Sequence, residues 1–142
     1  MFNFNDDKLD IVAVVGSREY RDSGHPTVEE VVAELARSAP NVTVISGGAR
    51  GVDQRAIAAA RGAGLAVREY PADWSRYGNR AGYLRNEEMV KAADMVVAFW
   101  DGESPGTKLT IGLCMKHHRT LLLYQAGVLQ VIPFDSHKAK DV

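Results

Sequence analysis

The chain has 142 residues, 46% hydrophobic and 25% charged, a composition typical of one soluble globular domain and not of a disordered or membrane protein. Seventeen Lys and Arg against eighteen Asp and Glu leave a formal net charge of −1, which argues against a broad electrostatic surface for nucleic acid. Cys114 is the only cysteine, which excludes an internal disulfide and a cysteine-based metal site. We therefore expect a single domain over residues 1–142, with no metal and no cofactor.

The beginning of the chain shows a strand followed by a helix. The run "DIVAVV" at 10–15 is apolar and β-branched and ends at Gly16, which predicts a buried strand followed by a tight turn. Four apolar residues then recur at helical spacing, and Thr27 with Glu30 has the spacing of a capping box. The pattern predicts a helix of about 12 residues whose apolar side covers the sheet; its apolar residues are Val28, Val31, Val32 and Leu35.

The same alternation continues along the chain. Further strands are predicted over 42–46, 65–70, 94–100 and 120–124, and further helices over 52–61, about 79–92 and about 107–118. Residues 71–78 are expected to form a loop, and the tail 125–142 is open, with "VLQVIPF" as a candidate edge strand. Five strand–helix alternations predict an α/β, Rossmann-like, doubly wound sheet of about five parallel strands with helices on both faces, its core over about 10–124.

Two further patterns bear on where the protein acts. No run approaches the roughly 18 apolar residues that span a bilayer. The start "MFNFNDDKLD" lacks the basic and apolar segments of a signal peptide. We expect a cytoplasmic protein that does not interact with membranes.

Three glycine-containing turns follow predicted strands: "GSREY", "SGGARG" and "DGESPGT". Ligands of open parallel sheets bind beyond the carboxyl ends of the strands, where helix N-termini attract anions. Neither G-x-G-x-x-G nor a Walker lysine pattern is present, so we expect neither an ordinary dinucleotide fold nor a P-loop ATPase. The candidate ligand-binding residues are Gly16, Ser17, Arg18, Ser46, Gly47, Gly48, Arg50, Gly51, Asp53, Arg80, Arg85, Asn86, Gly102, Ser104, Gly106 and Thr107.

Three of these residues have two interpretations. Asp53 is in the first turn of a predicted helix, where it either accepts ribose hydroxyls or caps the helix. Arg85 either contacts the ligand or forms a salt bridge to Asp94 or Asp101. Arg50 is either a phosphate ligand or a solvated loop residue.

Together, "GSREY", "SGGARGVD", "LRNEEM" and "AFWDGESPGT" resemble the SLOG superfamily of Rossmann-like nucleotide-binding domains, and within it the YspA-type, YpsA-related family. The resemblance covers about residues 10–124. The turn "SGGARGVD" is similar to that of DprA, which binds single-stranded DNA. "LRNEEM" and the "GT" of "SPGT" are similar to motifs of the Lonely Guy phosphoribohydrolases, which release a base from a nucleoside monophosphate.

The resemblance to the Lonely Guy motifs places a catalytic arginine at Arg85. The catalytic glutamate of that pattern falls at Thr110, so hydrolysis requires Asp101 or Glu103 to supply the carboxylate. Our first hypothesis is therefore binding or sensing of a nucleotide-derived ligand of the AMP or ADP-ribose class, and the second is a nucleotide N-glycosidase. Single-stranded DNA binding is third, since the net charge makes nucleic acid an unlikely partner; a homo-oligomer is compatible with all three.

Overall fold

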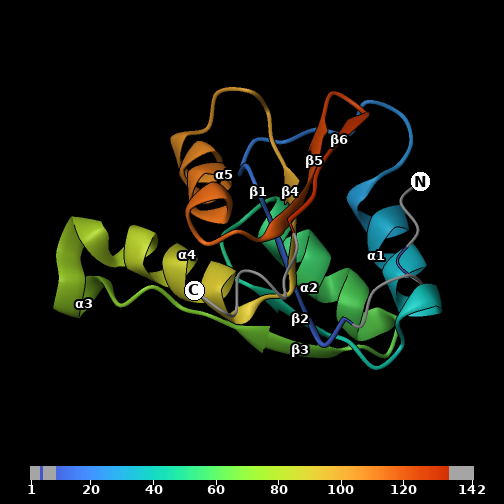
Figure 1. The fold of residues 1–142 in the computed structure, drawn as a ribbon, viewed down its shortest axis with the longest axis horizontal. Helices are drawn as coiled ribbons and strands as arrows, with labels where there is room; N and C mark the ends of the chain where they lie inside the picture. Colours follow the sequence, from blue (N-terminus) through green and yellow to red (C-terminus); the bar gives the residue numbers. More distant parts are fainter. Residues whose placement is uncertain (1–3, 5–8, 135–142) are drawn as a thin grey trace.

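The computed structural model describes residue 4 and residues 9–134, and it shows a six-stranded sheet between two layers of helices (Figure 1). The strands are β1 (Ile11–Gly16), β2 (Thr43–Ser46), β3 (Ala66–Glu69), β4 (Met95–Phe99), β5 (Thr120–Gln125) and β6 (Val128–Ile132). The helices are α1 (Val28–Ser38), α2 (Val52–Gly62), α3 (Trp74–Tyr77), α4 (Ala81–Ala92) and α5 (Pro105–Lys116), with a 3₁₀ turn η2 (Gly78–Arg80) before α4.

The strand order is β3-β2-β1-β4-β5-β6, and β1 to β5 are all parallel. The chain moves outward from β1 to β3, returns to the middle at β4 and moves outward again on the other side. The order therefore reverses between β1 and β4, which is where open α/β sheets bind ligands, beyond the carboxyl ends of the strands. The predicted doubly wound fold is confirmed.

Helix α1 forms for the local reasons visible in the sequence. The Thr27 hydroxyl accepts a hydrogen bond from the Glu30 N–H at 3.1 Å, and the Glu30 carboxylate accepts one from the Thr27 N–H at 2.9 Å. This capping box satisfies two backbone donors that the helix itself cannot pair. The four predicted apolar residues are all buried against the sheet, and burial of each such side chain contributes about 1.5–3 kcal/mol.

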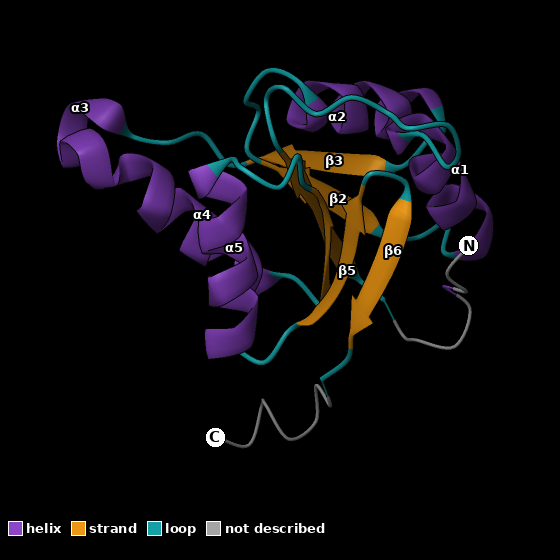
Figure 2. Ribbon diagram, turned by 90° about the horizontal axis from the view of Figure 1, so that it is seen from above, coloured by secondary structure: helices purple, strands orange, loops and turns teal. Residues whose placement is uncertain are grey.

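The sheet separates two hydrophobic cores, because successive side chains of a strand point to opposite faces. Val12 and Val14 of β1 lie in the core beneath α1 and α2. Ala13 and Val15 lie in the core beneath α4 and α5. Figure 2 shows the two pairs of helices on opposite sides of the strands. Strand β4 lies in the middle of the sheet and is buried along its whole length, as its unbroken apolar run predicts.

Two segments add to the predicted elements. Residues 74–77, expected to be loop, form the short helix α3, with the Asp73 carboxylate accepting a hydrogen bond from the Arg76 N–H at 3.1 Å. The candidate edge strand is confirmed as β6, which pairs antiparallel with β5. Their two-residue turn has Ala126 and Gly127 at φ of 52° and 75°, the backbone that tight hairpins require. The remainder of the predicted tail, 135–142, is outside the described residues.

Within the described residues, no helix is both long and apolar enough to cross a membrane. The same part of the chain holds no group of three or more His, Cys, Asp or Glu side chains placed to bind a metal ion.

Candidate functional site

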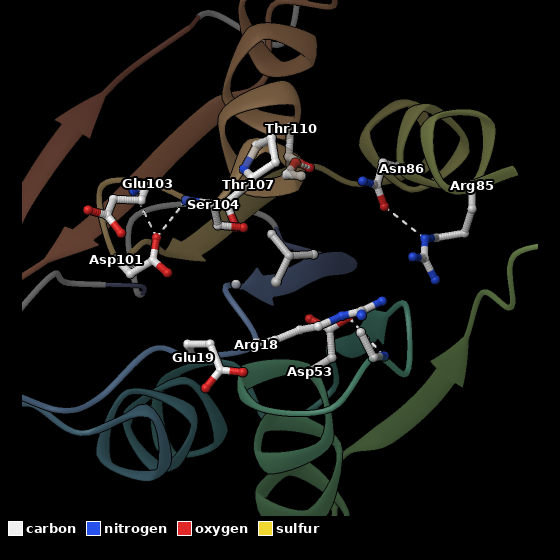
Figure 3. A pocket seen from close by; sticks show the side chains of 15 residues that line it. Arg18, Glu19, Asp53, Arg85, Asn86, Asp101, Glu103, Ser104, Thr107 and Thr110 are labelled. Carbon is white, nitrogen blue, oxygen red and sulfur yellow. Dashed lines mark hydrogen bonds between the residues drawn. The ribbon is translucent and has the colours of Figure 1, made fainter. Parts of the chain in front are cut away.

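A pocket of about 510 Å³ opens at the carboxyl ends of β1 and β4, where the strand order reverses (Figure 3). Its walls come from the turns after β1, β2 and β4 and from helices α2, α4 and α5. Asp101 and Glu103 stand on one side, and Arg85 and Asn86 stand on the other. The turn after β1 carries Arg18 into the gap between them.

Most of the candidate ligand-binding and catalytic residues are brought together here. Those in the lining are Gly16, Arg18, Asp53, Arg85, Asn86, Asp101, Glu103, Ser104, Gly106 and Thr107. Those outside the lining are Ser17, Ser46, Gly47, Gly48, Arg50, Gly51, Arg80 and Gly102. The lining also includes residues that sequence reasoning did not select, namely Val15, Glu19, Ala49, Pro105 and Thr110. Thr110 had a signal, because the resemblance to the Lonely Guy motifs places their catalytic glutamate at this position; the others had none.

Asp53 is a buried carboxylate in the pocket wall, with 5% of its surface exposed. Its Oδ2 accepts a hydrogen bond from the Ala49 N–H at 3.2 Å, whereas its Oδ1 is buried without a hydrogen-bond partner. Burial raises the pKa of Asp53 to about 6, against the opposing effects of the Ala49 amide, the positive charge of Arg85 and weaker contributions from Gly16 and Ser46. Gly51 is the N-cap of α2, and no side chain caps this N-terminus. Asp53, in the first turn of the helix, accepts the Ala49 N–H from the preceding turn and is not the N-cap residue.

Two buried serines hold the turns together and do not face the pocket. The Ser46 hydroxyl donates to the Val14 carbonyl at 2.6 Å, so its one proton is committed and does not satisfy Asp53. The Ser17 hydroxyl lies 3.2 Å from the Thr107 hydroxyl and accepts a hydrogen bond from the Asp101 N–H, also at 3.2 Å. These bonds join the end of β1 to β2 and to the start of α5.

Arg85 binds the protein backbone. One of its terminal nitrogens, Nη1, donates to the carbonyls of Gly47 at 2.7 Å and Tyr70 at 3.1 Å, and its Nε donates to the Asn86 side chain at 2.8 Å. The alternative salt bridge to Asp94 is wrong: that carboxylate accepts the N–H groups of Asp10 and Ile11, 2.9 Å from each.

The salt bridge to Asp101 is also wrong, since that carboxylate accepts its hydrogen bonds from the backbone N–H groups of Glu103 and Ser104 at the start of α5. Burial lowers the pKa of the Arg85 guanidinium, and the charge of Asp53 partly opposes this. Arg85 therefore fastens the turn after β2 to the turn after β3, at the edge of the pocket.

Replacing Arg85 with alanine is expected to lower the free energy of unfolding by about 1–3 kcal/mol, because two partly buried carbonyls lose their donor. Urea denaturation measures this change. Lys108→Ala is the matched control, since Lys108 is an exposed charge on α5 and should stay within about 0.5 kcal/mol of the parent. Equal stabilities of the two variants would contradict the fastening role of Arg85.

The space beside two glycines of "SGGARG" is filled by other parts of the chain. A Cβ added to Gly47 would lie 2.5 Å from Nη1 of Arg85, and one added to Gly51 would lie 2.5 Å from the Arg18 carbonyl oxygen. Gly51 also has φ +85° and ψ −129°, a backbone conformation restricted to glycine. These two glycines let the Arg85 guanidinium and the β1 turn pack against the chain after β2.

The turn after β4 is held by hydrogen bonds at the N-terminus of α5. The Asp101 Oδ1 accepts the N–H groups of Ser104 at 2.7 Å and Glu103 at 2.9 Å, and these bonds lower the pKa of Asp101. Ser104 is the N-cap without a side-chain cap, and Pro105 follows it. Gly106 and Thr107 of this first turn line the pocket, and the unpaired backbone donors of a helix N-terminus attract an anion.

The charges of the lining are mixed. Arg18 is exposed in the pocket mouth, whereas Arg50 lies outside it and pairs with Glu19 at 3.3 Å. The pocket thus has two guanidinium groups, from Arg18 and Arg85, and four carboxyl groups, from Glu19, Asp53, Asp101 and Glu103. A ligand that fits this lining carries hydrogen-bond donors as well as an anionic group.

Comparison with known proteins identifies the family. Residues 10–77 match the model of the YspA, cpYpsA-related SLOG family. The Gene 61 protein of Mycobacterium phage D29 is 41% identical over 104 residues, an alignment that covers 68% of this chain and 82% of the phage protein. The chain belongs to the SLOG superfamily. Its motifs after β1 and β2 lie within the matched segment, and those of α4 and α5 lie beyond it.

Solved structures share the fold of this SLOG domain. DNA processing protein A (DprA) from Streptococcus pneumoniae aligns with a TM-score of 0.65 at 21% identity, over 82% of this chain and 50% of DprA. DprA from Helicobacter pylori, described for its single-stranded DNA binding mode, aligns with a TM-score of 0.58 at 20% identity, over 80% of this chain and 64% of that protein. The chain thus spans about half to two thirds of these DprA chains. Membership of the SLOG superfamily fits a nucleotide-related binding role.

Proposed function

We propose that the pocket binds a nucleotide-derived ligand of the AMP or ADP-ribose class, with a phosphate between Arg18 and the N-terminus of α5 and the sugar hydroxyls toward Asp53. The buried Asp53 carboxylate carries the proposal. A carboxyl group with a pKa of about 6 costs the folded protein stability whenever it is ionised. Such a cost in a pocket wall is typical of a residue kept for binding or catalysis.

The other residues of the pocket lining favour a small ligand over a polyanion. The N–H groups at the start of α5 and the Arg18 guanidinium suit one phosphate. Carboxylates outnumber guanidinium groups in the same pocket, which is unfavourable for the repeated phosphates of nucleic acid and favourable for hydroxyl and amino donors. The Asn86 amide is a further polar group of the pocket. Its oxygen accepts the Arg85 hydrogen bond, and its nitrogen lies on the side away from Arg85 (Figure 3).

A nucleotide N-glycosidase is the second candidate, and the pKa of Asp53 favours it. A carboxyl group with a pKa of about 6 is suited to acid–base catalysis near neutral pH. Thr110 is buried in the lining, and its hydroxyl donates to the Gly106 carbonyl at 3.2 Å, so it supplies no carboxylate. Of the two carboxylates first considered for this role, Asp101 uses one oxygen to hold the turn, and Glu103 is exposed at the rim.

The test is calorimetric titration of the protein with AMP, with ADP-ribose and with a single-stranded DNA oligonucleotide. Arg18→Ala is expected to weaken nucleotide binding at least about tenfold, because it removes a charge-assisted hydrogen bond worth roughly 1.5–3 kcal/mol. Arg50→Ala is the matched control, since Arg50 is a neighbouring exposed arginine outside the lining, and it should bind as the parent does. Chromatography of the same mixtures measures base release.

Three results would contradict the proposal as stated. Binding of the oligonucleotide but of neither nucleotide would replace it with a DNA-binding role. Equal losses of nucleotide affinity in the two arginine variants would show that Arg18 does not hold a phosphate at the start of α5. Base release by the parent protein, lost in Asp53→Asn, would establish the glycosidase.

A further inference from the structure

Arg85 has hydrogen-bond donors that the protein itself does not use. Its Nε donates to the side chain of Asn86, and its Nη1 donates to the carbonyls of Gly47 and Tyr70. Its other terminal nitrogen, Nη2, donates to none of the described residues. No carboxylate of the described chain forms an ion pair with this guanidinium group. Both N–H groups of Nη2 are therefore charged donors without a partner.

The bonds of the other two nitrogens fix the direction of Nη2. The guanidinium group is planar, and its Nη1 is held against the turns after β2 and β3. Figure 3 shows Arg85 at the edge of the pocket, with one terminal nitrogen directed into the gap toward Arg18. Because Nη1 is bound to the two carbonyls, the nitrogen that faces the gap is Nη2. Arg85 thus offers its unused donors to the pocket that it lines.

The neighbouring Asn86 offers a donor of the same kind. A guanidinium nitrogen can only donate, so the amide atom that lies 2.8 Å from the Arg85 Nε is the oxygen. The amide nitrogen, Nδ2, is on the other side, away from Arg85 (Figure 3), and it donates to none of the described residues. Asn86 also lines the pocket. We name Nη2 of Arg85 and Nδ2 of Asn86 the α4 donor pair.

A second cation faces the α4 donor pair. Burial is the main cause that lowers the pKa of the Arg85 guanidinium, and the positive charge of Arg18 lowers it further, against the charge of Asp53. The two guanidinium groups are therefore near enough to repel each other. Arg18 is exposed and lies between the α4 donor pair and the start of α5. An anion placed between Arg18 and Arg85 replaces this repulsion with two charge-assisted contacts.

We infer that the α4 donor pair is a second anion subsite, which takes a second phosphate of the nucleotide on the side of Arg18 opposite the start of α5. The inference rests on the proposed function, in which a first phosphate lies between Arg18 and the start of α5. It narrows the ligand class to nucleotides with two phosphoryl groups, linked to each other or carried on separate sugar hydroxyls. The pocket of about 510 Å³ lies within the range of roughly 300–1,000 Å³ that is typical of small-molecule sites.

Calorimetric titration with AMP, ADP and adenosine 3′,5′-bisphosphate tests the second subsite. We expect ADP or the bisphosphate to bind at least about tenfold more tightly than AMP, because the second phosphate gains charge-assisted hydrogen bonds. Preference for ADP places the second phosphate next to the first, and preference for the bisphosphate places it on another sugar hydroxyl. Equal affinities for all three would overturn the inference and leave the proposed function standing. Failure of all three to bind would contradict both.

Asn86→Asp tests the location of the subsite. Aspartate keeps an oxygen for the Arg85 Nε and replaces the amide donor with a charged acceptor. The preference for the doubly phosphorylated nucleotide over AMP should fall at least about tenfold in this variant. Each preference is a ratio of two affinities of one variant, so a partial loss of folded protein affects both ligands alike.

Asn79→Asp is the matched control, since it makes the same change at an exposed residue of η2 outside the pocket lining. It should keep the preference of the parent. Asn86→Ala removes the donor without adding a charge, and it should also lose most of the preference. An Asn86→Asp protein with the same preference as Asn79→Asp would overturn the inference.

Discussion

Replacing Gly51 with alanine is expected to lower the free energy of unfolding by roughly 3–5 kcal/mol, a large part of the stability of a typical domain. Two costs add. At φ +85° and ψ −129°, a residue with a Cβ is strained. The new Cβ would also lie 2.5 Å from the carbonyl oxygen and 2.8 Å from the Cα of Arg18. These are backbone atoms, so a side-chain rotation cannot relieve the contact.

Gly62→Ala is the matched control for this change. Gly62 is the last residue of the same helix α2, and a Cβ there meets no atom within 4 Å. This variant should be as stable as the parent or more stable by about 0.5 kcal/mol, because alanine has the higher helix propensity. Urea denaturation compares the two. A Gly51→Ala protein as stable as the control would show that the turn before α2 does not require glycine.

The second large effect concerns Asp53, and its sign depends on pH. The pKa of this carboxyl group is about 6 in the folded protein, against an ordinary value of 3.8. Between these values the folded state holds a proton that the unfolded state has lost, so this residue favours folding more as the pH falls from about 6 to about 4. Above pH 6 its ionisation costs roughly 2–3 kcal/mol.

Asp53→Asn removes this cost, so the variant is expected to be more stable than the parent at pH 8, by up to about 2–3 kcal/mol. The advantage should shrink toward pH 4. Chemical denaturation across this range measures the difference. At the same time, nucleotide affinity should fall about tenfold or more, because the ligand loses an anionic acceptor. A variant less stable than the parent at pH 8 would instead make Asp53 a structural residue of the turn before α2.

These two changes separate the two purposes of the "SGGARGVD" turn. Gly51 serves the folded structure, since the space beside it is filled by the chain after β1. Asp53, two residues later, reduces stability while lining the pocket. A nucleotide is the ligand we propose for it, and loss of binding together with a gain in stability is the expected mark of a residue retained for its ligand.

Local pattern was sufficient for the sheet and its main helices, although it missed the short helix α3. The Thr27 capping box, the apolar spacing of α1 and the unbroken run of β4 depend on residues a few positions apart, and each forms as predicted. The alternation of strands and helices then restricts the topology, because parallel strands need crossover helices. The sequence also placed the glycine turns at one end of the sheet, since parallel strands end on the same side.

Only the tertiary structure decided what the site residues contact. The Arg85 guanidinium reaches the Gly47 carbonyl, 38 positions away in the chain, and no local pattern distinguishes that bond from a salt bridge or a ligand contact. From the sequence alone, Asp53 is equally well interpreted as a helix cap or as an acceptor of ribose hydroxyls. The structure shows that the packing of α2 buries this carboxylate and leaves one of its oxygens unpaired. Periodicity encodes which face of an element is buried, whereas the partner of a polar side chain depends on how separate elements pack, and that is set by the whole core.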